Sequence, residues 1–169
     1  LRSSSRIIVE EDRVYLGYLH QAESMTARCL RTMAASEYGD FRDAEGVLEQ
    51  VCTAEGITLE EKQREAVLRA CAHRGGVLVL NGRAGCGKTF TLNIIIKVLR
   101  ELYKRQGLSF EAQVMAPTGQ AAQVAHKATG LPASTIHRAL HIVIDKNMET
   151  DTMITCDCVV IDEFSMVGI

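Results

Sequence analysis

Apolar residues recur at helical spacing over much of the chain. A period of about 3.6 residues predicts amphipathic helices, because it places the apolar side chains on one face. This period is found over residues 14–35, 40–55, 90–105 and 120–128. Capping patterns predict two more helices. One begins with the Thr-x-x-Glu pattern at Thr58, and a short one, capped by Ser134 or Thr135, continues to Leu140.

Short, mainly apolar runs lie between these helices. They predict strands at Val77–Leu80, Ala112–Ala116 and Cys158–Ile161. Apolar runs of this length are typical of parallel strands that are buried on both faces. Strands that alternate with helices predict an α/β fold, with a doubly wound parallel sheet and flanking helices.

Two segments lack a clear period. Residues 1–12 are expected to form a linker or a lone strand, and residues 141–155 a small hairpin. We therefore expect a helical N-terminal region over residues 1–56 and an α/β domain over residues 57–169.

The composition is that of an ordinary folded chain. Of 169 residues, 47% are hydrophobic and only two are proline, which favours a packed core over disorder. The formal net charge is −2, whereas a free-standing nucleic-acid-binding module usually carries a clear basic excess. This charge leaves room for a motor that binds nucleic acid through a few local contacts.

The six cysteines do not form a metal-binding pattern. Cys156 and Cys158 are close in sequence, but no second pair of Cys or His lies at the spacing of a zinc site. We expect reduced, mostly buried thiols, as in an intracellular protein, and a cytoplasmic location. No apolar run approaches the roughly 18 residues of a membrane-spanning helix.

A glycine-rich loop follows the first predicted strand directly. Its Gly-x-x-x-x-Gly-Lys-Thr pattern comprises Gly82, Arg83, Ala84, Gly85, Cys86, Gly87, Lys88 and Thr89. Between a strand and a helix, such a loop binds the phosphates of a nucleoside triphosphate through backbone N–H groups. Lys88 is expected to reach the β- and γ-phosphates, and the Thr89 hydroxyl to bind Mg²⁺. The alternative is a glycine turn that binds nothing, and the flanks on both sides argue against it.

Two carboxylates follow the last predicted strand. Asp162 is expected to hold Mg²⁺, and Glu163 to orient or deprotonate an attacking water. An acidic strand end alone is common, but together with the glycine loop it predicts an ATPase. A small-molecule kinase needs no such glutamate and is the weaker alternative.

Gln63 lies on the helix that precedes the first predicted strand. Its amide can pair with both the N6 amino group and N7 of adenine. Taken alone, a glutamine on a helix surface more often has no such function.

Residues 57–169 resemble the first motor domain of superfamily 1 DNA helicases, in the RecD-like branch of the P-loop ATPases, a group that includes AAA domains. Besides the loop and the acidic strand, three blocks carry the likeness: Leu59–Gln63, Ala116–Ala122 and Thr135–Leu140. The last two are the more specific, since many ATPases share the loop and the strand. The stretch from Val14 to Glu23 is similar, less sharply, to the helical region that precedes the motor in longer members.

The resemblance implies an ATP-driven motor that uses Mg²⁺ and translocates 5′ to 3′ along single-stranded DNA. It implies that Lys88 and Glu163 are catalytic and that Gln63 reads adenine. It also implies partners, namely single-stranded DNA and other subunits of a recombination or repair complex. The residues it assigns to the DNA track are Thr118, Gly119, His137 and Arg138.

The sequence departs from the family at Ala84, Cys86 and Gln120, where proline, threonine and arginine are usual. In the family, a second RecA-like domain supplies arginines to the ATP site, and such arginines contribute about 10³–10⁵ in rate. We expect the motor domain to be truncated after the acidic strand in this chain, and we therefore expect the chain alone to bind ATP but to hydrolyse it very slowly. The helicase part of a conjugative relaxase and an ATP-binding module without unwinding activity are the alternatives.

Overall fold

The computed structural model describes residues 7–36, 41, 43–72, 76–83, 85–142 and 153–168. Its internal contacts divide the chain into two compact units. The first comprises residues 1–39, 73–79 and 168–169, and the second comprises residues 40–72 and 80–167.

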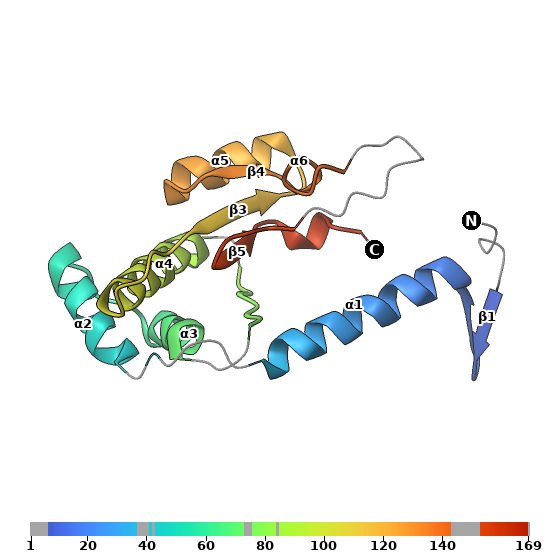
Figure 1. Ribbon diagram of the computed structural model, residues 1–169, viewed down its shortest axis with the longest axis horizontal. Coiled ribbons are helices and arrows are strands. Elements are labelled where there is room, and N and C mark those ends of the chain that lie inside the picture. Colours follow the sequence, from blue (N-terminus) through green and yellow to red (C-terminus); the bar gives the residue numbers. More distant parts are fainter. Residues whose placement is uncertain are drawn as a thin grey trace. The chain divides into compact units, whose positions relative to one another are not determined.

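The first unit contains a β-hairpin followed by a long helix (Figure 1). Its elements are β1 (Ile7–Glu10), β2 (Arg13–Leu16) and α1 (Gly17–Ala35). The strands are antiparallel, and Val9 pairs with Val14. The predicted helix from residue 14 was therefore wrong for its first three residues, which form a strand because β1 supplies a partner. His20 of α1 fixes the hairpin, since its Nε2 lies 2.8 Å from the Glu10 carboxylate.

The helix α1 contains no buried residue. Its apolar side chains are instead exposed, among them Tyr18, Met25 and Met33. The amphipathic period predicts this helix correctly, but among the described residues its apolar face is not buried in a core.

Three helices of the second unit share one core. They are α2 (Ala44–Glu55), α3 (Glu61–Ala72) and α4 (Lys88–Arg105). Val47, Leu48, Val67 and Val98 are completely buried between them. Arg64 of α3 also forms ion pairs with two carboxylates of α2, those of Glu45 and Glu49.

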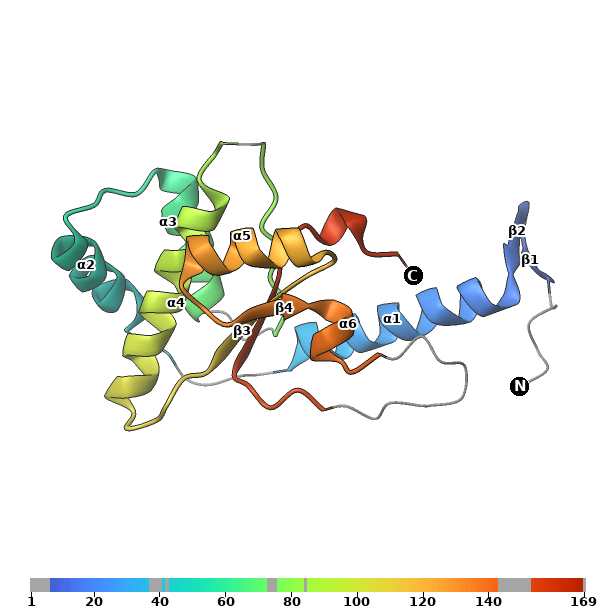
Figure 2. The same cartoon turned by 90° about the horizontal axis from the view of Figure 1, so that it is seen from above.

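A parallel sheet lies on the other side of α4, as Figures 1 and 2 show. Its strand order is β4-β3-β5. Ile96 of α4, Val114 of β3 and Ala125 of α5 form the buried core on this side. The strands and the remaining elements are β3 (Ala112–Ala116), α5 (Gly119–Thr129), β4 (Ala133–Thr135), α6 (Ile136–Ala139), β5 (Cys158–Ile161) and the 3₁₀ helix η1 (Phe164–Met166).

This architecture confirms the predicted α/β class: a parallel sheet with flanking helices after a helical region. The strands expected at 112–116 and 158–161 are present with those bounds. The strand β4 was not predicted, because three residues are too short for a periodic signal.

The predicted strand Val77–Leu80 is absent from the sheets that the described residues form. Val79 is 80% exposed and Leu78 is 41% exposed. An apolar run indicates a strand only where a neighbouring strand accepts its hydrogen bonds, and none pairs with this run in the described structure.

Three other expectations concern the domain boundary, the hairpin and membrane-spanning helices. Residue 56 was the predicted end of the N-terminal region, whereas the contacts group α2 with α3 and α4; the domain boundary itself stays a prediction. The predicted hairpin at 141–155 lies mostly outside the described residues. No described helix is both long and apolar enough to cross a membrane.

Candidate functional site

The glycine-rich loop leads directly into α4, as the sequence predicts. Gly85 and Gly87 have φ angles of 79° and 80°, in the left-handed region that side chains disfavour. The N–H of Thr91 donates to the carbonyl of Gly87 at 2.8 Å, which closes the first turn of the helix. The loop therefore ends at the positive end of an 18-residue helix, where anions bind readily. Ala84, also predicted to bind the nucleotide, lies outside the described residues.

Lys88 curls back into this loop. Its Nζ donates to the carbonyl of Gly82 at 2.8 Å and to that of Arg83 at 3.1 Å. The side chain is exposed, as is that of the following Thr89. A positive charge is thus held among the backbone groups of the loop, which suits a polyphosphate. These residues fit the triphosphate expected from the sequence.

The thiol of Cys86 lies against the start of the loop. A Cβ added to Gly82 would be 2.5 Å from the Cys86 Sγ, so a side chain at this position would require the thiol to move. Cys86 is exposed, whereas Cys71 on α3 is buried. All six cysteines are free, as predicted, although only Cys71 is fully buried.

Gln63 lies in the first turn of α3, beside the loop. Its Oε1 accepts the N–H of Glu60 at 3.1 Å, and its Nε2 donates to the carbonyl of Cys86 at 3.5 Å. The capping pattern predicted from Thr58 is thereby corrected: α3 begins at Glu61, and Gln63 provides the contact expected from Glu61.

The two carboxylates lie at the carboxyl end of β5, as predicted. The N–H of Asp162 donates to the Met115 carbonyl at 2.9 Å, which ties this end to β3. The Asp162 carboxylate accepts the N–H of Glu163 at 2.9 Å. Glu163 has a φ angle of 53°, which is unfavourable for a residue with a side chain. Such strain often accompanies functional sites, and the sequence gives no sign of it.

The structure thus joins some of the predicted residues and leaves others apart. Gln63, Cys86 and Gly87 contact one another, and Lys88 contacts Gly82 and Arg83. Among the described residues, no hydrogen bond or ion pair links Lys88 or Thr89 to the carboxylates of β5. A shared Mg²⁺ site for Thr89 and Asp162 therefore stays a prediction.

The residues predicted to line a DNA track follow β3 and β4. These strands are parallel, and Ala116 pairs with Thr135, so both strands end at the same edge of the sheet. The Thr118 hydroxyl accepts the N–H of Ala121 at 3.2 Å and caps α5. In the same way, the Thr135 hydroxyl caps α6 by accepting the N–H of Arg138 at 3.2 Å. Gly119, His137 and Arg138 are exposed beside these caps.

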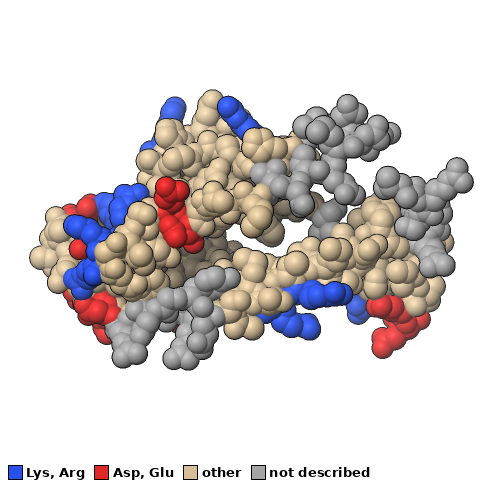
Figure 3. Space-filling model, in the orientation of Figure 1, with Lys and Arg blue, Asp and Glu red and all other residues tan. Residues whose placement is uncertain are grey.

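The surface charge agrees with the near-neutral composition. On the face of the second unit shown in Figure 3, basic and acidic side chains alternate, and the described residues form no broad basic area there. Several charged side chains of the second unit pair with each other, such as Lys97 with Glu55 at 2.6 Å.

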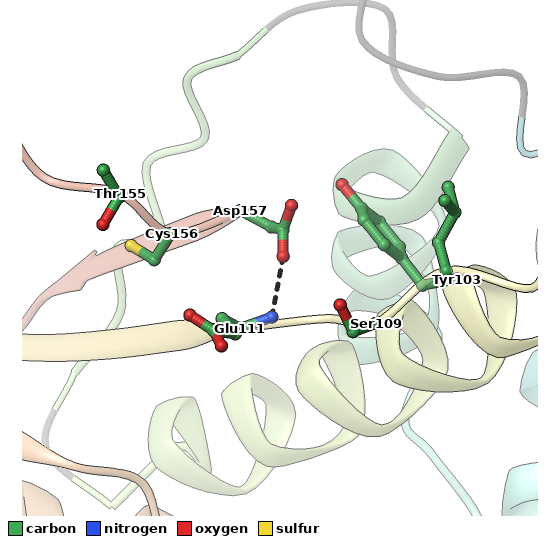
Figure 4. Close-up of a pocket in the computed structure, with 7 residues that line it drawn as sticks. Tyr103, Ser109, Glu111, Thr155, Cys156 and Asp157 are labelled. Atoms are coloured by element: carbon green, nitrogen blue, oxygen red, sulfur yellow. Dashed lines mark hydrogen bonds between the residues drawn. The ribbon is translucent and has the colours of Figure 1, made fainter.

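A separate hollow lies at the opposite edge of the sheet, where β3 and β5 begin (Figure 4). The Asp157 carboxylate accepts the N–H of Glu111 at 2.7 Å, and the Asp157 N–H donates to the Glu111 carbonyl at 2.9 Å. Burial raises the pKa of Cys158 to about 11, and that of Tyr103 is also raised, first by burial and then by Asp157. The two hydrogen bonds between Asp157 and Glu111 fix the register of β3 and β5. This hollow lies away from the glycine-rich loop.

The sequence was compared with known proteins. The sequence profile of a protein family described as an AAA domain matches residues 58–169. The ATP-dependent RecD2 DNA helicase of Deinococcus radiodurans is 31% identical over 162 residues, which cover 94% of this chain. The chain spans only 21% of the length of that helicase.

Proposed function

The chain belongs to the AAA domain family, and from this membership and its similarity to the RecD2 helicase we propose that it is the ATP-binding part of a RecD-like DNA helicase. The protein that contains it hydrolyses ATP to translocate along single-stranded DNA, 5′ to 3′ by resemblance. The observation that carries the proposal is the phosphate loop. Two left-handed glycines, Gly85 and Gly87, bring the Lys88 ammonium to the start of α4.

Each residue of the site has a distinct role in this proposal. The backbone N–H groups of residues 82–88 and the Lys88 ammonium bind the phosphates. Thr89 and Asp162 would hold Mg²⁺, which neutralises charge on the phosphate oxygens when it is bound. The Glu163 carboxylate orients the attacking water and accepts its proton.

The DNA side of the proposal rests on two capped helix starts at one edge of the sheet. Thr118 caps the start of α5 and Thr135 caps the start of α6, whose Arg138 is exposed. Backbone N–H groups and arginine are usual ligands of DNA phosphates. Contacts of this kind would fix the strand without reading its sequence, as translocation requires.

The proposal is tested first by nucleotide binding. Titration of this chain with a fluorescent ATP analogue and Mg²⁺ should give saturable binding, and Lys88→Ala should abolish it. Lys127→Ala, on the exposed surface of α5, is the control and should bind as the wild type does. Absence of binding by the wild-type chain would refute the proposal.

The motor activity is tested on the full-length protein. Its ATP hydrolysis should rise when single-stranded DNA is added, and Glu163→Gln should abolish hydrolysis while ATP binding remains. Hydrolysis that does not respond to DNA would contradict the helicase assignment and leave an ATPase.

A further inference from the structure

Gln63, the residue expected to read the base, contacts the phosphate loop. We infer that its side-chain amide holds the loop in shape, so that one group serves both base recognition and phosphate binding. This inference rests on the proposed function, since it assigns Gln63 as a positioning residue for the same ATP site.

Both hydrogen bonds of the amide determine its orientation. The partner on one side is the Glu60 N–H, which can only donate, and the partner on the other is the Cys86 carbonyl, which can only accept. Gln63 therefore places its oxygen toward α3 and its nitrogen toward the loop. Because the Glu60 contact lies within the first turn of α3, the helix anchors an amide that reaches across to the loop.

The neighbouring glycine shows how closely the amide fits. A Cβ added to Gly87 would lie 2.7 Å from the Gln63 Nε2. The amide nitrogen therefore contacts two consecutive residues, Cys86 and Gly87, directly before Lys88. A contact at this point restrains the carbonyl of Cys86 and the left-handed turn at Gly87 from which α4 begins.

These contacts leave the amide free to bind adenine at the same time. An amide oxygen accepts two hydrogen bonds and an amide nitrogen donates two, and the protein uses one of each at Gln63. The remaining acceptor suits the adenine N6 amino group, and the remaining donor suits N7. Guanine presents a carbonyl where adenine has this amino group, so it opposes the Gln63 oxygen that Glu60 holds in place. Through Gln63, the identity of the base thereby affects the conformation of the phosphate loop.

The test separates a residue that only reads the base from one that also holds the loop. Binding of Mg²⁺ complexes of ATP, GTP and tripolyphosphate is measured by calorimetry for the wild type, Gln63→Ala and Gln63→Met. We expect both variants to bind tripolyphosphate more weakly, by about 3- to 10-fold, the effect of one lost hydrogen bond. ATP should lose more affinity than tripolyphosphate, because its contacts with Gln63 are lost as well, and the preference for ATP over GTP should fall. Gln63→Met keeps the length of the side chain but lacks both polar groups. Gln123→Ala, on the exposed surface of α5, is the matched control and should change nothing.

A second measurement needs no nucleotide. Cys86 is exposed on the loop, so the rate at which its thiol reacts with a maleimide reports the shape of the loop. Mass spectrometry distinguishes Cys86 from the other exposed thiol, Cys29. We expect both Gln63 variants to change the Cys86 rate several-fold and to leave the Cys29 rate unchanged.

The outcomes separate this inference from the proposed function. If the variants lose affinity for ATP but bind tripolyphosphate as before, with an unchanged Cys86 rate, Gln63 only reads the base and the inference is wrong. If the wild-type chain binds none of the ligands, the proposed function itself fails. Urea denaturation of each variant verifies that it is folded before it is compared.

Discussion

Replacing Val47 with alanine should destabilise the second unit by about 2–3 kcal/mol. Val47 lies on α2, is 0% exposed, and packs in the core shared with α3 and α4. The substitution removes two buried carbons, each worth about 0.8 kcal/mol. A residual cavity of about 50 Å³ would add about 1 kcal/mol at ~24 cal/mol per Å³. Partial collapse of the cavity lowers this sum, which gives the stated range.

Urea denaturation followed by circular dichroism measures this effect. Val124→Ala is the matched control, because Val124 also lies on a helix but is 60% exposed. We expect the control to change the free energy of unfolding by less than about 0.5 kcal/mol. A Val47→Ala effect equally small would refute the reasoning, because it would mean that α2 contributes no core.

The same reasoning bears on the domain boundary. A chain of residues 40–169 retains α2 and should fold, whereas a chain of residues 57–169 exposes the apolar faces of α3 and α4 and should not. Equal melting temperatures for the two chains would support a boundary at residue 56 and contradict the structural grouping of α2 with the ATP-binding unit.

Three further predictions concern single residues. Alkylation of Cys86 should block ATP binding and should be slowed by Mg²⁺-ATP, because the Cys86 Sγ lies against Gly82 inside the loop. The Cys86→Ala variant should bind ATP and resist the reagent. Equal rates of alkylation with and without ATP would contradict this prediction. Thr118→Ala should cost about 1 kcal/mol of stability by removing the α5 cap, while Thr118→Ser should restore it, as thermal melts can verify. Burial raises the pKa of Cys71 to about 12, and the pKa of Cys158 is raised to about 11, from 9.0 in both cases. The unfolded chain therefore loses these protons first, and the free energy of unfolding should fall as the pH rises from 9 toward 11; Cys158→Ala should flatten this dependence in urea titrations.

The sequence predicts the elements of the ATP site well because their residue types leave few alternatives. The left-handed turns at Gly85 and Gly87 need glycine, and α4 begins directly after them. The strand at Val77–Leu80 was predicted wrongly because an apolar run reports burial tendency and says nothing of a hydrogen-bonding partner. The contacts of Gln63 with the loop could not be foreseen, since they join residues 23 positions apart in the sequence. The left-handed backbone of Glu163 likewise depends on how β5 ends, which no local pattern specifies.

The helix α4 lies between two cores, with Ile95 and Val98 in one and Ile96 in the other. It cannot unravel without opening both, so its amide protons should exchange with solvent only when the whole unit unfolds. Its first turn carries Lys88 and its far end reaches Arg105, which pairs with Asp43 just before α2. Lys88 and Arg105 therefore lie at the two ends of one continuous helix that both cores hold in place along its length.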